Sequence, residues 1–117
     1  ELSIQEIGEE LRKISKLCRD LKIDKKEFFG GSMTISSLGG IGGTFFTPII
    51  NPPEVAILGV GKSFDKLVKD KNKIISRKIL PISLSYDHRI IDGAEGARFC
   101  VYLGKCLGKD FAFKLAV

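Results

Sequence analysis

Hydrophobic residues recur at spacings of three and four through the first part of the chain. They are Ile4, Ile7, Leu11, Ile14, Cys18 and Leu21. This spacing places them along one stripe of an amphipathic helix, with glutamate and lysine on the other face. The pattern is present from residue 1 with no cap in front, so we expect the helix to begin outside this chain or very near its first residue. Residues 24–27 are typical of the cap of a short turn, which the Gly30-Gly31 pair ends.

Three stretches in the middle of the chain predict strands. Residues 33–38 and 54–60 are short and mostly apolar, whereas residues 79–86 alternate large apolar side chains with proline and serine. Pro81 has no donor for a sheet ladder, which favours an edge position or a strand start. Residues 45–50 are apolar and are expected to be extended.

The last helix is predicted to open at Asp92, because aspartate is a favoured N-cap residue and Glu95 follows three positions later. Its apolar stripe consists of Ala97, Cys100, Val101 and Leu107. The order helix, strands, helix predicts an α/β domain, an α+β arrangement in two layers.

Composition narrows the class of protein. The length of 117 residues and the 44% hydrophobic content suit one small domain. The net charge of +5 comes largely from residues 62–78. This basic segment is either a solvated surface segment or one that attracts a polyanion or a phosphorylated cofactor. Aromatic residues are not interleaved there as in single-strand nucleic-acid platforms, so we expect no nucleic-acid partner. No run approaches the ~20 apolar residues of a membrane span, so we expect no membrane partner.

The three cysteines are Cys18, Cys100 and Cys106. Their odd number, their spacing and the presence of one histidine argue against a disulfide framework or a metal site, and favour a reducing compartment. All three fall in helical patterns, which predicts packing rather than nucleophilic chemistry.

His88 is the only histidine of the chain, and it follows a predicted strand. Its unperturbed pKa of roughly 6.5 allows proton transfer near neutral pH. Asp92 lies four residues further on, but capping the helix is by itself enough to explain an aspartate there. For His88, the simpler alternative to catalysis is a structural histidine bound to a backbone carbonyl. A hydroxyl partner is left open among Ser32, Thr34, Ser36, Ser37, Ser83 and Ser85.

Residues 56–63 match the P-loop motif loosely and follow an apolar strand. Asp87, at the end of another predicted strand, has the position of the aspartate that binds magnesium in such proteins. However, Ala56 stands where the first glycine is required, and large apolar residues fill the rest of the loop. These residues favour a continuing strand, so a P-loop NTPase is the least favoured function.

Three segments resemble, in order, motifs of the acyltransferase (E2) catalytic domain of 2-oxo acid dehydrogenase complexes. Residues 87–94 resemble D-H-R-x-x-D-G-A, residues 33–44 resemble T-I-S-x-L-G, and residues 46–59 resemble P-x-x-x-x-P-E-x-A-I-L-G. The amino-acid sequences of these three segments are most similar to the motifs of dihydrolipoamide acetyltransferases. The resemblance implies a chloramphenicol-acetyltransferase-like fold, the fold of coenzyme A-dependent acyltransferases, in homotrimers that assemble into a larger hollow core.

The implied reaction transfers an acyl group, acetyl by this resemblance, between coenzyme A and dihydrolipoamide on a separate lipoyl domain. Both substrates would enter a channel at the subunit interface from opposite ends. The resemblance also implies contact with E1 and E3 components through domains outside this segment, and a location in the bacterial cytoplasm or the mitochondrial matrix.

The resemblance assigns roles to individual residues. His88 would be the general base, because a free thiol of pKa ~8.5 is mostly protonated at neutral pH and a neutral imidazole can take its proton. Ser36 of a neighbouring subunit would stabilise the oxyanion, and Asp92 would support the site and cap the helix. The coenzyme A side would be lined by Ser37, Val60, Gly61 and Lys62.

One departure concerns length, because the family's catalytic domain extends well before the helix that begins this chain. We therefore expect residues 1–117 to be the C-terminal half of such a domain, without lipoyl and subunit-binding domains. An alternative hypothesis follows: an inactive structural or assembly fragment that packs into such a core without turnover.

Overall fold

The structure is a computed structural model that describes residues 2–108. The chain divides into two compact units, residues 1–31 with 104–117 and residues 32–103, which are described separately. In the first unit α1 (Ile4–Arg19) follows Ser3, whose hydroxyl accepts a hydrogen bond from the Glu6 N–H while the Glu6 carboxylate accepts one from the Ser3 N–H. The helix thus begins very near the first residue, as one of the two expected positions, whereas the expectation that it has no cap was wrong. The short helix η1 (Lys25–Phe28) is capped by Asp24, as predicted.

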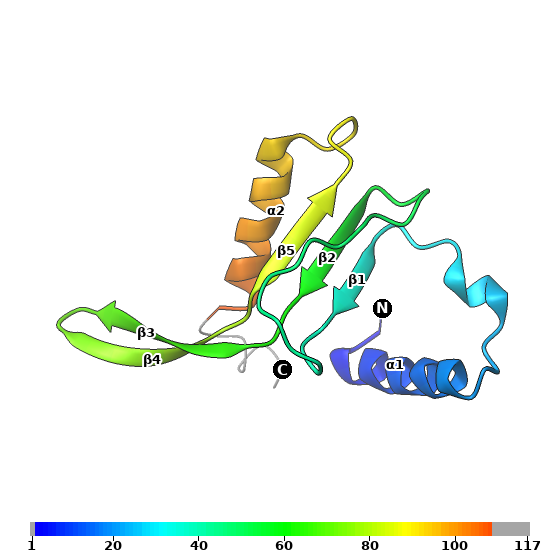
Figure 1. Ribbon diagram of the computed structural model, residues 1–117, viewed down its shortest axis with the longest axis horizontal. Helices are drawn as coiled ribbons and strands as arrows, with labels where there is room; N and C mark the ends of the chain where they lie inside the picture. Colours follow the sequence, from blue (N-terminus) through cyan, green and yellow to red (C-terminus); the bar gives the residue numbers. More distant parts are fainter. Residues whose placement is uncertain (1, 109–117) are drawn as a thin grey trace. The chain divides into compact units, whose positions relative to one another are not determined.

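The second unit is built on a three-stranded sheet in the order β1-β2-β5 (Figure 1). Strand β2 (Ala56–Val60) lies in the centre, parallel to β1 (Thr34–Ser37) and antiparallel to β5 (Ile82–Tyr86). All three predicted strands are present, each shorter than expected. Pro81 directly precedes β5, which is an edge strand of this sheet, so its position is also confirmed.

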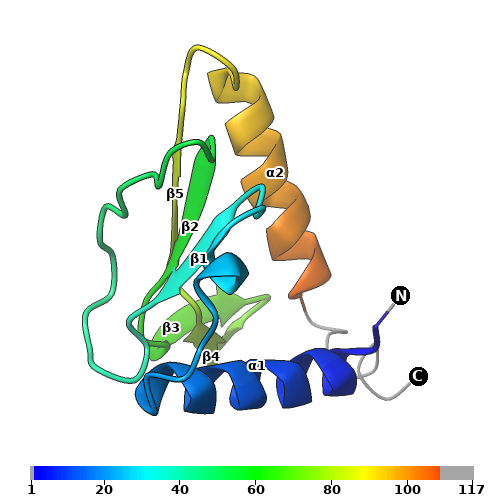
Figure 2. The same ribbon diagram turned by 90° about the vertical axis from the view of Figure 1, so that its right-hand side faces the viewer.

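Helix α2 (Gly93–Cys106) lies along one face of the sheet, next to β5 (Figures 1 and 2). The contact is close, because a Cβ added at Gly96 would lie 2.8 Å from the ring of Tyr86. The connection before β2 lies over the other face, where the Phe46 ring would be 2.9 Å from a Cβ added at Gly59. The predicted layering of helix on sheet is confirmed.

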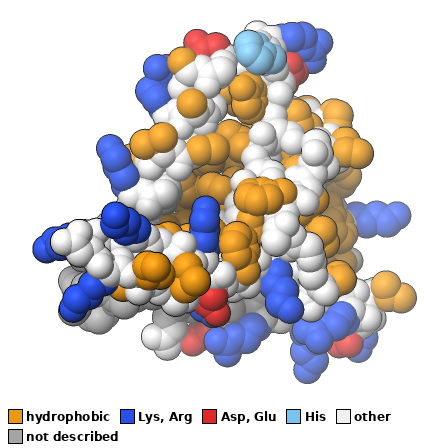
Figure 3. Space-filling view, turned by 60° about the vertical axis from the view of Figure 1, so that its left-hand side comes forward, with side chains coloured by type: hydrophobic (Ala, Val, Ile, Leu, Met, Phe, Trp, Pro, Cys, Tyr) orange, Lys and Arg blue, Asp and Glu red, His pale blue; other side chains and the backbone are white. Residues whose placement is uncertain are grey.

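Strand β2 contains the three buried hydrophobic residues of the described part of the chain, Ala56, Ile57 and Leu58. The residues that match the P-loop motif loosely continue as this buried strand, so they do not form a phosphate-binding loop. Many large hydrophobic side chains elsewhere in residues 2–108 are exposed, and Figure 3 shows hydrophobic side chains on one face of the molecule. The described residues therefore form a sheet and helices with a small core.

A β-hairpin of β3 (Phe64–Asp70) and β4 (Lys73–Ile79) forms a separate two-stranded sheet, which we did not predict (Figure 1). It carries most of the basic segment. Asp70 pairs with Arg77 at 2.9 Å, and Asp65 pairs with Lys78 at 3.2 Å.

The cysteines lie on the helices, as predicted: Cys18 on α1, and Cys100 and Cys106 on α2, all half-buried free thiols. Within residues 2–108 no helix is long and apolar enough to cross a membrane. In the same range, metal-binding side chains do not gather in groups of three or more.

Candidate active site

A turn of six residues joins β5 to α2 and carries His88 at its start, so the imidazole follows the end of a strand as predicted. The turn is fixed through the main chain of Asp87. Its N–H donates to the Val55 carbonyl at 2.8 Å, and its carbonyl accepts from the N–H groups of Ile90 and Ile91, both at 3.0 Å. The turn is therefore bonded both to the segment before β2 and to itself.

The His88 side chain is exposed, and its ring lies beside the ring of Tyr86. Its ring centroid lies 5.8 Å from that of Tyr86, with the two rings tilted by 36°. A Cβ added at Gly93 would lie 3.9 Å from Nε2, which places that nitrogen near the start of α2. In the part of the chain that the structure describes, the imidazole forms no hydrogen bond, so the simpler alternative of a histidine held by a backbone carbonyl is not observed.

The neighbouring charges form one pair. Arg89 binds the Asp87 carboxylate, with Nη2 at 2.7 Å from Oδ2. Hydrogen bonds from the Arg89 side chain and then from its N–H lower the pKa of Asp87 from its usual 3.8 to about 2, with the guanidinium charge adding to the effect. The carboxylate is therefore ionised at every pH where a histidine titrates.

A hollow of about 530 Å³ opens beside His88. Its lining comes from residues 50 and 52–55 before β2, and from residues 86–90 after β5. Most of these side chains are apolar. Glu54 adds a carboxylate that accepts a hydrogen bond from the Thr34 hydroxyl of β1. The volume suits a small organic substrate group beside an exposed imidazole.

Asp92 caps α2, as predicted. Its Oδ1 accepts a hydrogen bond from the Glu95 N–H at 2.7 Å, and its carbonyl accepts from the Gly96 N–H at 3.1 Å. Among residues 2–108 its carboxylate forms no hydrogen bond with His88. The structural role of Asp92 is thus observed, whereas its catalytic role stays a prediction.

Ser36 lies on β1, far from His88 in the same chain. It pairs with Gly59 of β2, which pairs with Ser83 of β5, three residues before Tyr86. Strands ~4.8 Å apart, with residues ~3.3 Å apart along them, place Ser36 about 14 Å from Tyr86. His88 follows beyond the end of that strand. A single chain therefore does not bring the predicted base and the predicted oxyanion donor together.

The residues predicted to bind coenzyme A gather at the end of the sheet near Ser36. Ser37 pairs with Val60, and Gly61 and Lys62 follow directly. The Gly61 N–H donates to the Pro81 carbonyl at 3.0 Å, and the Lys62 N–H to the Gly43 carbonyl at 2.9 Å. The structure thus brings these four residues together, and their ligand stays a prediction.

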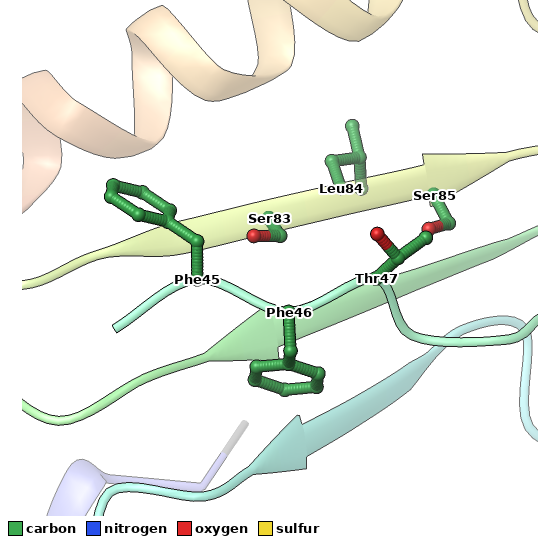
Figure 4. Close-up of a pocket in the computed structure, with 6 residues that line it drawn as sticks. All are labelled: Phe45, Phe46, Thr47, Ser83, Leu84 and Ser85. Atoms are coloured by element: carbon green, nitrogen blue, oxygen red, sulfur yellow. The ribbon is translucent and has the colours of Figure 1, made fainter. Parts of the chain in front are cut away.

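A second, smaller hollow of about 250 Å³ lies between residues 45–47 and β5 (Figure 4). Ser83 and Ser85, two of the hydroxyls left open by the sequence, point toward residues 45–47, whereas Leu84 points to the α2 side. Sequence reasoning missed the parts played by Tyr86 and Arg89. The contact between Asp87 and Arg89 could have been predicted, because an aspartate side chain often accepts a hydrogen bond from the backbone N–H two residues later.

The comparisons with known proteins agree on one family. The family model for 2-oxoacid dehydrogenases acyltransferase (catalytic domain) matches residues 1–112. The chain is 55% identical over 108 residues to the dihydrolipoyllysine-residue acetyltransferase component of the pyruvate dehydrogenase complex from Cupriavidus necator, covering 92% of the chain and 19% of the relative. It is 55% identical over 104 residues to the component of the same name from Haemophilus influenzae, covering 89% and 18%.

Solved structures give the same result. A structure of Azotobacter vinelandii dihydrolipoamide acetyltransferase, from an investigation of a serine, a histidine and an asparagine in its catalytic mechanism, matches with a TM-score of 0.90 and 46% identity. The cubic core of a pyruvate dehydrogenase multienzyme complex matches with the same values, and each match covers 96% of this chain and 46% of the other. The chain thus spans less than half of these structures and about a fifth of the curated relatives. The predicted acyltransferase-core fold is confirmed, and the chain belongs to the 2-oxoacid dehydrogenase acyltransferase family.

Proposed function

We propose that this chain is the C-terminal half of a catalytic domain that transfers an acetyl group between coenzyme A and dihydrolipoamide in a pyruvate dehydrogenase complex. One observation carries the proposal. His88 follows Ser36 by 52 positions, and Asp92 follows His88 by four. The serine, histidine and asparagine investigated in the Azotobacter vinelandii enzyme have the same two spacings. The third residue alone differs, being an aspartate here.

The chemistry follows from these side chains. The neutral imidazole of His88 removes the proton of the attacking thiol, and the thiolate attacks the thioester carbonyl. The Ser36 hydroxyl donates a hydrogen bond to the oxyanion of the tetrahedral intermediate. When the intermediate collapses, the C–S bond breaks and the departing thiolate takes the proton from the imidazolium to leave as a thiol. No acyl-enzyme on a cysteine is needed, in agreement with three half-buried cysteines that lie on helices rather than in the turn that carries His88.

We propose that each site is completed by a second copy of the chain within a homotrimer. The separation of about 14 Å between Ser36 and Tyr86 supports a serine from the neighbouring copy beside His88. Such trimers would assemble into a larger core, and the match to the cubic core of a pyruvate dehydrogenase multienzyme complex favours this arrangement. Lipoyl domains would bring dihydrolipoamide to the site, and the E1 and E3 components would bind through other parts of the full-length protein.

The coenzyme A side of the proposed site lies at the opposite end of the sheet from His88. Ser37, Val60, Gly61 and Lys62 line it, and the exposed Lys62 ammonium could pair with a phosphate of coenzyme A. The curated relatives described above are bacterial, which favours the bacterial cytoplasm over the mitochondrial matrix as the location.

The test is acetyl transfer from acetyl-CoA to dihydrolipoamide, catalysed by the full-length assembled protein. His88→Ala is expected to lower kcat by about 10²–10⁴-fold, and Ser36→Ala by about 10²–10³-fold. Ser15→Ala, an exposed serine on α1, is the matched control and should leave the rate unchanged. A His88→Ala enzyme that retains its rate within a few-fold would refute the proposal.

Mixed assemblies test whether the site is shared between copies. If His88→Ala and Ser36→Ala chains are unfolded and assembled together in equal amounts, sites that combine an intact histidine with an intact serine form by chance. Random mixing predicts recovery of about a quarter of the parent activity. A mixture as inactive as either variant alone would place both residues of a site in one chain.

One observation favours the alternative of an inactive assembly fragment for the 117 residues by themselves. Within the described residues only Ala56, Ile57 and Leu58 are buried hydrophobic residues, while many large ones are exposed. Light scattering and a coenzyme A thermal-shift assay distinguish the two functions. A monomer without a coenzyme A shift would favour the fragment, whereas a trimer with a shift would favour an active core.

A further inference from the structure

Asp87 and Arg89 flank His88 in the sequence and are joined to each other by four hydrogen bonds. The Arg89 N–H and Nε each donate to Asp87 Oδ1 at 3.0 Å. Nε also donates to Oδ2 at 3.2 Å, and Nη2 donates to Oδ2 at 2.7 Å. The residues on the two sides of the imidazole are thus locked together, and we name this pair the clasp.

The clasp is anchored to the sheet through the main chain of Asp87. Its N–H binds the Val55 carbonyl, and its carbonyl binds the N–H groups of Ile90 and Ile91. The imidazole itself has no hydrogen bond within residues 2–108 and contacts the Tyr86 ring at 5.8 Å between centroids. Its location therefore depends on the backbone that the clasp holds.

The exposure of the pair separates a role in folding from a role in catalysis. The Arg89 side chain is 88% exposed and that of Asp87 is 20% exposed. An ion pair with one member in water contributes little to stability. A general base, in contrast, has to be placed within ~0.5 Å of its working position, and a displacement of ~1 Å can cost ~10²-fold in rate.

We propose that Asp87 and Arg89 are positioning residues that hold the His88 imidazole at the hollow of about 530 Å³, a role that rests on the general base proposed above. The pair touches neither thiol nor thioester in this role. It acts by fixing the backbone on both sides of the base. Because the pKa of Asp87 is lowered to about 2, the clasp is ionised throughout the pH range of a thiol-transfer assay.

The variants are Asp87→Asn, Arg89→Gln and the double variant in the full-length assembled protein. We expect each to lower kcat by about 10–100-fold, with KM for coenzyme A and for dihydrolipoamide within two-fold of the parent. The double variant should be no slower than either single variant, because both remove the same clasp. Arg89→Lys should also have a lowered kcat, because an ammonium keeps the positive charge but cannot bind both carboxylate oxygens as the planar guanidinium does.

The matched control is Asp70→Asn, which breaks the other aspartate–arginine pair, of 2.9 Å, in the hairpin. It should leave kcat at the parent value. All variants are first compared by light scattering and thermal unfolding, where the clasp variants should assemble and melt like the parent.

Three results would overturn the inference. If Asp87→Asn and Arg89→Gln each retain kcat within two-fold while His88→Ala is inactive, the proposed function stands and the clasp has no part in it. Clasp variants that fail to assemble would make the pair structural. Rate losses that multiply in the double variant would show two independent roles. Retained activity in His88→Ala would instead refute the proposed function itself.

Discussion

Replacing Gly61 by alanine tests how tightly the connection after β2 is built. An added Cβ would lie 1.9 Å from the Thr44 carbonyl oxygen and 2.8 Å from its carbon. These are backbone atoms, so no rotamer change relieves the clash. Moving them puts at risk the hydrogen bonds from Gly61 to Pro81 and from Lys62 to Gly43. Each bond contributes about 1 kcal/mol and overpacking costs about 1–3 kcal/mol, so we expect a loss of about 3–5 kcal/mol.

The assay is thermal unfolding of the full-length protein, followed by circular dichroism. A loss of 1 kcal/mol lowers Tm by about 2–4 °C in a domain of 150–250 residues, so Gly61→Ala should lower Tm by about 6–20 °C. Gly8→Ala is the control, because no atom lies within 4 Å of its added Cβ and alanine favours the interior of α1. It should raise Tm slightly. A Gly61→Ala protein that melts within about 2 °C of the parent would refute the steric reasoning.

Three further predictions concern the turn and α2. Asp92→Ala should cost about 1 kcal/mol of stability in thermal unfolding by removing the N-cap, whereas Asp92→Asn should cost a few tenths. The pKa of Asp87 is lowered from 3.8 to about 2, so the small contribution of its pair with the exposed Arg89 to stability is complete above about pH 5 and is lost as the pH falls through 2; acid titration of Asp87→Asn should show a slightly smaller loss in that window. Gly96→Ala would place a Cβ 2.8 Å from the Tyr86 ring, which contacts His88, and should lower kcat about ten-fold with KM unchanged.

The hairpin shows why part of the fold could not be predicted from the sequence. Apolar residues of β3 and β4 occupy both faces, since Val68 and Ile75 pair on one face while Leu67 and Ile74 lie on the other. The period of two that marks a half-buried strand is therefore broken. Its turn is also poorly marked, because Lys71 rather than glycine or asparagine adopts a positive φ of 55°. The α1 capping box, in contrast, was present in the sequence as serine followed by glutamate three residues later.

The candidate site was predictable where it depends on local sequence. A lone histidine between a strand and an N-cap aspartate identifies His88 and Asp92 without knowledge of the fold. Ser36 was one hydroxyl among six, and a period of two says which face a side chain occupies but not which strand lies beside it. Only the register of β1, β2 and β5 shows that Ser36 is remote from His88 within one chain. The same register brings Val55 to Asp87, so the anchor of the clasp is a contact between distant segments that no local pattern encodes.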